Sequence, residues 1–270
     1  MPKRTSAAST IRLEVADRVA TVTLARPEIH NAFNEVMIAE LNDLFAQLAE
    51  DPSVRVVVLT GAGKSFCAGA DLHWMGKMVS YSFEENFEDS MKLAELMHRM
   101  YAHPCPTICR VNGATVGGGT GLVAACDIAI ASTSAFFSLS EVRIGLVPAC
   151  IGPYVVKRIG EARARELFLT GERIPAEKAA QIGLVNAAVP EADLDAEVRK
   201  RVELMLKCGP EALKAAKKLL EGVTARAAGE LKEFTAEMIA QLRVSEEGQE
   251  GMKAFLAKRT PRWALEGGSK

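Results

Sequence analysis

Alternating and periodic apolar positions along the chain predict a mixed α/β protein. Two runs rich in β-branched residues, 11–15 and 19–24, flank the polar residues 16–18 and predict a hairpin. Further short strands are predicted at 54–60, 107–111, 127–131 and 184–189. Because these strands are separated by segments of helical periodicity, the pattern indicates strand and helix elements in one body.

Helices are predicted where apolar residues recur at intervals of three and four. Asn34 is a predicted N-cap for a helix over 35–50. The long helix at 82–103 carries a stripe that we expect to face the core, namely Phe83, Phe87, Met91, Ala94, Met97 and Tyr101. Beyond Pro148, helices are expected at 153–159, 161–169, 176–182, 191–207, 210–221 and 228–257. The last carries the stripe Leu231, Phe234, Met238 and Leu242.

This distribution divides the chain into an α/β core over 1–205 and a helical C-terminal region over 206–270. The second region has amphipathic helices but few residues with which to form a core of its own. We therefore expect it to be an oligomerisation region that packs on a partner subunit.

Charge and composition exclude several classes of function. The chain has 33 Lys and Arg against 34 Asp and Glu, so no basic field is present to bind nucleic acid or an anionic membrane. The longest apolar runs fall short of the roughly 18 residues of a membrane span, and no secretory signal is seen, which predicts a cytoplasmic protein. The four histidines and six cysteines show no metal-ligand spacing. Neither a metal site nor a disulfide is expected, and the thiols are predicted to be reduced and buried.

Two glycine-rich segments, 61–71 and 112–121, each follow a predicted strand and precede a predicted helix. The segment 61–71 does not match the P-loop motif, because Val58 stands where the first glycine of that motif is required. The segment 112–121 does not match the dinucleotide-binding motif, because Leu122 stands at the position of its third glycine. Glycine admits close approach of a ligand, so backbone N–H groups in two such loops can form an oxyanion hole. Glu141 is the best candidate for a proton-transfer group beside it.

Several motifs, in order, resemble the enoyl-CoA hydratase/isomerase (crotonase) family over residues 11 to about 190. They lie at 24–33, 65–72, 111–122 with Cys126 and Asp127, 169–174 and 180–185. The resemblance implies an α/β fold of the crotonase-like ββα superhelix type, with a C-terminal helical trimerisation region. It also implies a homotrimer or a dimer of trimers.

The resemblance further implies a site for an acyl-CoA substrate, with CoA as part of the substrate and no permanently bound cofactor. The N–H groups of Ala70 and Gly118 would hold the thioester oxygen. Backbone around Ala68 and Leu72 would receive the adenine, and Lys258 matches a lysine that reaches a CoA phosphate in relatives. Two basic positions of the family are occupied here by Glu28 and His73.

The catalytic pattern departs from that of the family hydratases, which use two glutamates. The first position is Gly121 here and the second is Glu141, and residues 148–152 also differ, because many relatives have glycine directly after the proline and two glycines at the end. Gly121 is expected to leave room for a branched acyl group. Arg143 is a candidate to bind a distal substrate carboxylate, although pairing with a surface acid is favoured.

Three functions remain open from the sequence. Residues 139–148, the glycine triplet and residues 258–263 resemble the bacterial branch that hydrates methylglutaconyl-CoA and related esters, which favours an enoyl-CoA hydratase. A single glutamate also suits an isomerase that moves a double bond from the 3 to the 2 position. A scaffold with a decayed active site is the third alternative.

Overall fold

In the computed structural model, which describes residues 4–7 and 10–265, the strands form two sheets. The larger has seven strands in the order β1-β2-β3-β4-β6-β8-β11. The strands from β3 onward run parallel, and β1 and β2 are antiparallel to their neighbours. Their bounds are β1 Arg4–Ala7, β2 Ile11–Ala16, β3 Val19–Leu24, β4 Val56–Gly61, β6 Thr107–Val111, β8 Ile128–Ser132 and β11 Ala187–Val189.

The smaller sheet has four short strands in the order β10-β9-β7-β5. They are β5 Ser65–Cys67, β7 Ala114–Val116, β9 Phe136–Ser138 and β10 Arg173–Pro175. Three-residue strands are too short to show an alternating pattern, so the sequence pattern does not predict this sheet. Because β5, β7 and β9 are parallel, the segments that follow them leave the sheet at the same edge.

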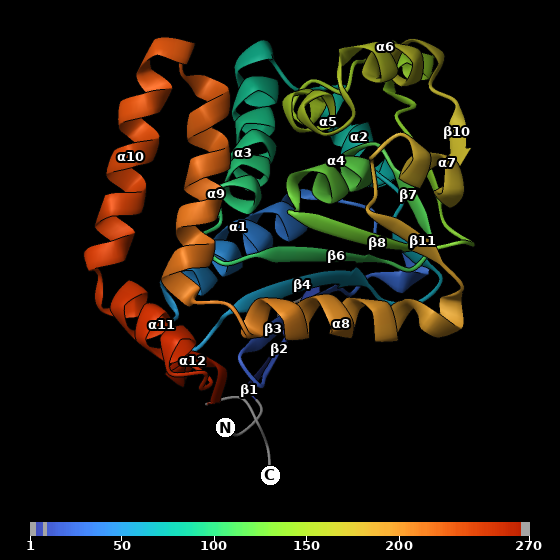
Figure 1. The fold of residues 1–270 in the computed structure, drawn as a ribbon. Helices are drawn as coiled ribbons and strands as arrows, with labels where there is room; N and C mark the ends of the chain where they lie inside the picture. Colours follow the sequence, from blue (N-terminus) through green and yellow to red (C-terminus); the bar gives the residue numbers. More distant parts are fainter. Residues whose placement is uncertain (1–3, 8–9, 266–270) are drawn as a thin grey trace.

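Helices cover both faces of the larger sheet (Figure 1). On one face, α8 (Leu194–Leu206) packs Leu194, Val198 and Val202 against Val56, Val58, Ile108 and Ile130. On the other face lie α1 (Glu35–Glu50), α3 (Phe83–Tyr101) and α4 (Gly118–Ala125), which form the main core. The predicted cap of α1 is confirmed, because Met37 N–H donates to Asn34 Oδ1 at 2.9 Å.

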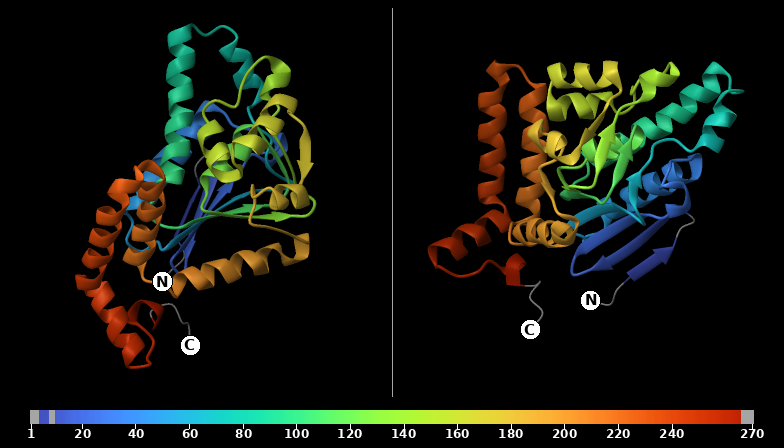
Figure 2. Two further views of the ribbon diagram at one scale, coloured as in Figure 1. Left: turned by 45° about the horizontal axis from the view of Figure 1, so that its top comes forward. Right: turned by 90° about the vertical axis from the view of Figure 1, so that its right-hand side faces the viewer.

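The remaining helices connect and flank these layers. They are α2 Leu72–Met78, α5 Gly152–Ile159, α6 Glu161–Thr170, α7 Ala176–Gln181, α9 Pro210–Ala225, α10 Ala228–Val244, α11 Glu246–Leu256 and α12 Arg262–Leu265. Short 3₁₀ segments are η1 Pro27–Ile29, η2 Glu141–Ile144 and η3 Glu191–Asp193. Figures 1 and 2 show α9 and α10 side by side at one flank of the sheets, with α11 and α12 beyond them.

The prediction of one continuous helix over 228–257 is wrong. The chain leaves the helical conformation at Ser245, which ends α10 and caps α11 by accepting a hydrogen bond from Gly248 N–H at 3.0 Å. The stripe on α10 is only half-buried, and its Phe234 packs against Gly222 of α9. The C-terminal helices therefore leave much of their apolar surface uncovered by the described chain.

The prediction that the whole stripe of α3 is core is also wrong. Met97 is fully buried, but Phe83, Phe87 and Met91 are more than half exposed. The N-terminal half of α3 extends past the sheets, as Figure 1 shows, so nothing in the described chain packs over it. The rings of Phe83 and Phe87 stack on each other instead, at 6.2 Å between centroids.

The thiols are partly as predicted. All six cysteines are free, and Cys67, Cys105, Cys109 and Cys126 are buried. Cys150 is half-buried and Cys208 is exposed. The prediction that the thiols are buried is therefore correct for four cysteines and wrong for these two. In the portion of the chain that the structure describes, none of the helices combines the length and the apolar character needed to cross a membrane.

Candidate active site

The edge of the smaller sheet brings together three segments that are far apart in the sequence. β5 is followed by Gly69 and Ala70, β7 by Gly117 and Gly118, and β9 by Glu141. A Cβ built on Gly69 would lie 3.2 Å from the carbonyl oxygen of Val116, at the end of β7. The two glycine loops are therefore in van der Waals contact at this edge.

The first glycine loop presents the amide of Ala70 on its free side. Phe33 N–H donates to Gly69 O at 2.7 Å, and Asp71 N–H donates to Phe33 O at 2.7 Å. In such a parallel bridge, the N–H of the intervening residue points away from the partner strand. Within the described residues, the N–H of Ala70 donates no hydrogen bond. Ala70 is also exposed, so this donor is open to a ligand.

The second glycine loop turns directly into α4. Gly117 has φ +53°, a conformation that favours glycine, and its own N–H donates to Ser138 O at 2.9 Å. Gly118 is the first residue of α4, and within the described chain its N–H donates no hydrogen bond, as is usual for a first helical turn. A Cβ on Gly118 would lie 2.7 Å from the Phe33 ring, so this ring packs directly on the loop.

The carboxyl group of Glu141 lies against the same loop. A Cβ built on Gly117 would be 3.1 Å from Glu141 Oε1 and 4.0 Å from Gly69 Cα. Within the described residues, the buried Oε2 has no hydrogen-bond partner. Burial raises the pKa of this carboxyl group above its ordinary value, since loss of water disfavours its charged form. A carboxyl group with raised proton affinity thus lies against the second glycine loop.

Gly121 does not open a space beside this carboxylate. A Cβ on Gly121 would lie 2.1 Å from Ile151 Cγ2 and 3.4 Å from Met97 Sδ. Ile151 is 2% exposed, so its side chain fills the volume next to Gly121. The two departures from the family pattern, at 121 and within 148–152, are therefore one change. The expectation that Gly121 leaves room for a branched acyl group is wrong.

A double-mutant cycle can test this pairing. Gly121→Ala should lower the free energy of unfolding by about 1–3 kcal/mol, because the added methyl group overlaps Ile151. In a protein that already carries Ile151→Gly, Gly121→Ala should lower the free energy of unfolding by clearly less. The difference between the two effects is the coupling energy of the two sites. Denaturant unfolding of the four proteins measures it, and equal costs in both backgrounds would contradict the pairing.

Two of the remaining predicted residues lie next to the first glycine loop. Ala68 is half-buried, and its N–H donates to His30 O at 3.0 Å. Leu72, at the start of α2, is 82% exposed. The loop between them is fixed by Asp71, which caps α2 at His73 N–H and pairs with Arg26 at 2.7 Å. The Arg26 side-chain hydrogen bond helps to hold the pKa of Asp71 below its ordinary value, although burial opposes it.

Lys258 and Arg143 are not held beside this edge. Lys258 follows α11, which Figures 1 and 2 place at the opposite end of the molecule from α2. Arg143 is exposed, and its guanidinium lies against the end of α6, donating to Thr170 O at 3.4 Å. Among the described residues it pairs with no carboxylate, so the favoured expectation of a surface acid stays a prediction.

Sequence reasoning assigned no role to residues 26–33, which support the first glycine loop. Asn31 is fully buried and donates from Nδ2 to the carbonyl oxygens of Ala62 and Ser65, at 2.9 and 2.8 Å. His30 and Asn31 both have φ +56°, which is unusual outside glycine. Phe33, at the end of this segment, touches both loops. The family-like motif at 24–33 was the one sequence feature that marked this segment, but a motif does not show which residues the segment contacts.

The described residues contain no group of three or more His, Cys, Asp or Glu side chains that could hold a metal ion. The polar groups at the sheet edge are backbone amides and one carboxyl group. The amide N–H groups can stabilise negative charge on a carbonyl oxygen, and the carboxyl group can accept and return a proton nearby.

Comparison with known proteins supports the same class of site. The sequence model of the enoyl-CoA hydratase/isomerase family matches residues 14–266. A curated relative from Thermus thermophilus, whose name places it among the enoyl-CoA hydratases, is 37% identical over 245 residues, covering 91% of this chain and 97% of the relative.

Solved structures give the same result. The structure of an enoyl-CoA hydratase from Shewanella pealeana superposes with a TM-score of 0.91 at 40% identity, covering 94% of this chain and 96% of that one. One from Legionella pneumophila, described with the family name crotonase, has a TM-score of 0.90 at 45% identity, covering 95% and 100%. This chain belongs to the enoyl-CoA hydratase/isomerase family. The predicted crotonase fold is confirmed, and the protein is an enzyme of that family.

Proposed function

We propose that this protein is an enoyl-CoA hydratase that adds water across the conjugated double bond of a 2-enoyl-CoA thioester. One observation carries the proposal. The carboxyl group of Glu141, whose buried Oε2 has no hydrogen-bond partner among the described residues, lies against Gly117, in the loop that also presents the N–H of Gly118. The relatives named as hydratases support the same reaction class.

The proposed step uses the two amides and the carboxylate together. Glu141 takes one proton from a water molecule while the water oxygen bonds to the β-carbon. The electron pair of the double bond moves onto the thioester, and the N–H groups of Ala70 and Gly118 stabilise the enolate oxygen that forms. Glu141 then returns the proton to the α-carbon, which completes the addition of one water. The raised pKa of Glu141 suits a group that accepts and returns a proton near neutral pH.

A second candidate reaction is favoured by the residue at 121. Hydratases of the family use two glutamates, and the position of the first is Gly121 here. Ile151 fills the space beside it, so Glu141 has no second glutamate to act with. An isomerase needs only one carboxylate, which takes a proton from the α-carbon and returns it to the γ-carbon. Glu141 can perform this transfer in the same geometry.

The acyl group is proposed from sequence similarity alone. Residues 139–148 and 258–263 resemble enzymes that hydrate methylglutaconyl-CoA and related glutaconyl esters. We propose such an ester as substrate. Neither the volume at Gly121 nor the position of Arg143 supports it, because Ile151 fills the first and the second lies against α6.

Assays with three thioesters separate the candidate functions. Crotonyl-CoA, methylglutaconyl-CoA and a 3-enoyl-CoA are added separately, and thioester conjugation is followed by ultraviolet absorbance. The proposal predicts loss of conjugation with a conjugated ester, fastest with methylglutaconyl-CoA. Gain of conjugation with the 3-enoyl ester alone would establish the isomerase. No change with any ester, despite retained CoA binding, would indicate a scaffold.

We also propose that the protein forms a trimer or a dimer of trimers. The C-terminal helices expose large apolar side chains, at Leu220, Val244, Phe255, Leu256 and Leu265. We propose that Lys258 of one subunit contacts the CoA phosphates bound by another, because within one chain α11, which Lys258 follows, lies far from α2. Light scattering should give three or six times 29.0 kDa, and a monomer would contradict the proposal.

A further inference from the structure

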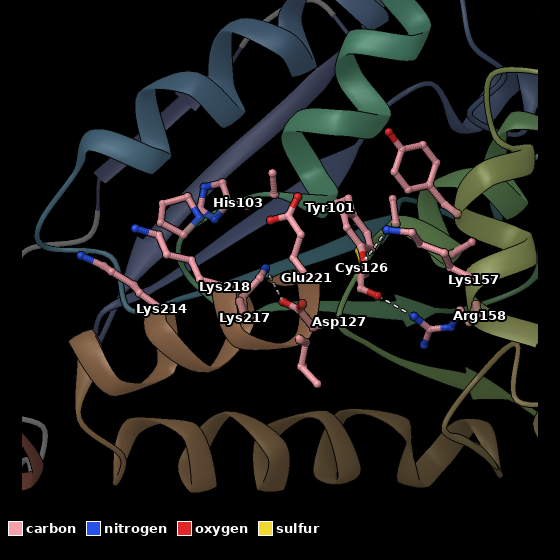
Figure 3. Close-up of a pocket in the computed structure, with 16 residues that line it drawn as sticks. Tyr101, His103, Cys126, Asp127, Lys157, Arg158, Lys214, Lys217, Lys218 and Glu221 are labelled. Carbon is pink, nitrogen blue, oxygen red and sulfur yellow. Dashed lines mark hydrogen bonds and ion pairs between the residues drawn. The ribbon is translucent and has the colours of Figure 1, made fainter. Parts of the chain in front are cut away.

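A cavity lies at the opposite end of α4 from the glycine loop. It has a volume of about 290 Å³ and is bordered by the ends of α3 and α4, by α5 and by α9. Figure 3 shows the side chains that surround it. Since α4 has eight residues, with a rise of about 1.5 Å each, the two ends are about 12 Å apart. The cavity is therefore separate from the site at Glu141 and was not indicated by any sequence motif.

Basic side chains predominate around this cavity. Five cationic residues line it, against the two carboxylates Asp127 and Glu221. This gives a local formal charge of +3 in a chain whose formal net charge is −1. Burial lowers the pKa of His103, a further lining residue, to about 4, so its ring is neutral at neutral pH. The cationic residues are Lys157, Arg158, Lys214, Lys217 and Lys218.

Internal ion pairs neutralise only part of this charge. Lys217 pairs with Asp127 at 2.7 Å, and Lys214 pairs with Glu211 at 2.9 Å. Lys218 has no hydrogen bond or ion pair within the described residues, and Lys157 contacts the Tyr101 hydroxyl at 3.3 Å and the face of its ring. Two ammonium groups at this cavity are thus without a carboxylate partner.

Arg158 adds a further positive charge to the lining of the cavity. Its guanidinium donates to the carbonyl oxygens of Leu184 and Cys126 and to Asn186 Oδ1. All of these partners are neutral, and burial lowers the pKa of the group. A partly buried cation that is hydrogen-bonded but has no anionic partner favours binding of an anion nearby.

Aromatic side chains also line the cavity. The rings of Tyr101 and Tyr154 lie 5.3 Å apart between centroids, and Lys157 lies over the Tyr101 ring at 4.7 Å from its centroid. The cavity volume of about 290 Å³ is just below the roughly 300–1,000 Å³ usual for ligand pockets, so a compact ligand is favoured.

From this charge and shape we propose that the cavity between α4, α5 and α9 is a binding site for a small polyphosphate anion. Lys157 and Lys218, whose ammonium groups have no carboxylate partner among the described residues, supply positive charge that attracts the anion from α5 and α9, and Arg158 adds to this field. The negative charge of Glu221 repels the anionic ligand and lowers its affinity. The proposal does not depend on the reaction at Glu141.

Calorimetric titration of the full-length protein with inorganic pyrophosphate tests this site. One pyrophosphate should bind per chain, with unchanged affinity when CoA is saturating. The double variant Lys157→Ala/Lys218→Ala should bind at least tenfold more weakly, and Glu221→Gln should bind more tightly. Lys178→Ala, on α7 outside the cavity, is the matched control and should bind like the natural protein. Higher ionic strength should weaken binding.

A parallel titration with ADP distinguishes the sources of phosphate. Tighter binding than pyrophosphate indicates a nucleotide whose base contacts the tyrosines, and equal binding indicates that the phosphates alone are recognised. The proposal is overturned if pyrophosphate does not bind, if CoA displaces it, or if the lysine variants retain full affinity. Thermal unfolding of each variant shows that it is folded.

Discussion

Replacing Glu141 by glutamine should lower kcat for hydration by about 100-fold or more. The substitution keeps the shape of the side chain but removes the group that takes a proton from water, and general acid–base catalysis contributes about 10²–10⁴-fold. Affinity for CoA should be nearly unchanged, because the carboxyl group lies at the glycine loop and not at the proposed adenine contacts near Ala68 and Leu72. Steady-state kinetics and CoA titration measure the two effects.

The pH dependence of the reaction rate tests whether the carboxylate of Glu141 is the base. The base must be ionised, so the rate falls as pH decreases through the pKa of Glu141. Because burial raises this pKa, the acid limb of kcat/KM should lie at a higher pH than for an ordinary glutamate. The residual activity of Glu141→Gln should lack this limb. Glu237→Gln, on the exposed surface of α10, is a control and should keep the profile of the natural protein. Full turnover by Glu141→Gln would assign the proton transfer to another residue.

Replacing Ala70 by proline should lower kcat by about 10²–10³-fold, equivalent to about 2.7–4 kcal/mol of transition-state stabilisation. Proline removes the backbone N–H, which makes no hydrogen bond within the described residues. The bridge to Phe33 uses the carbonyl of Gly69 and the N–H of Asp71, so both of its hydrogen bonds can be retained.

The control for this substitution is Ala70→Ser, which keeps the N–H and changes the exposed side chain by one hydroxyl group. It should retain turnover within a few-fold of the natural protein. Circular dichroism and thermal unfolding establish that Ala70→Pro is folded. If the folded proline variant turns over at the natural rate, the Ala70 amide has no part in the reaction.

Much of the larger sheet and its helices could be predicted because most of these elements are long enough to show a pattern, but β1, with four residues, was not predicted. The strands β3, β4 and β6 and the capped helix α1 fall close to their predicted positions. The smaller sheet could not be predicted, since its strands have three residues and are defined by pairing between distant segments. This sheet is nevertheless what brings Ala70, Gly118 and Glu141 to one edge.

Long-range packing also explains the errors. Spacing alone gives Phe83 and Met97 the same place in one helical stripe, yet only Met97 lies under other elements. Gly121 alone suggests an enlarged pocket, whereas the structure shows Ile151 in that volume. Both outcomes depend on which segment packs against the residue, and a local pattern does not contain that information.

The central claim is that two amides and one carboxylate act on the same thioester. Infrared difference spectroscopy of a bound 2-enoyl-CoA, labelled with ¹³C at the thioester carbonyl, tests it most directly. In the natural protein the carbonyl band should move to lower frequency than in water, and in Ala70→Pro the shift should be smaller. A carbonyl band at its aqueous position in the natural protein would contradict the claim.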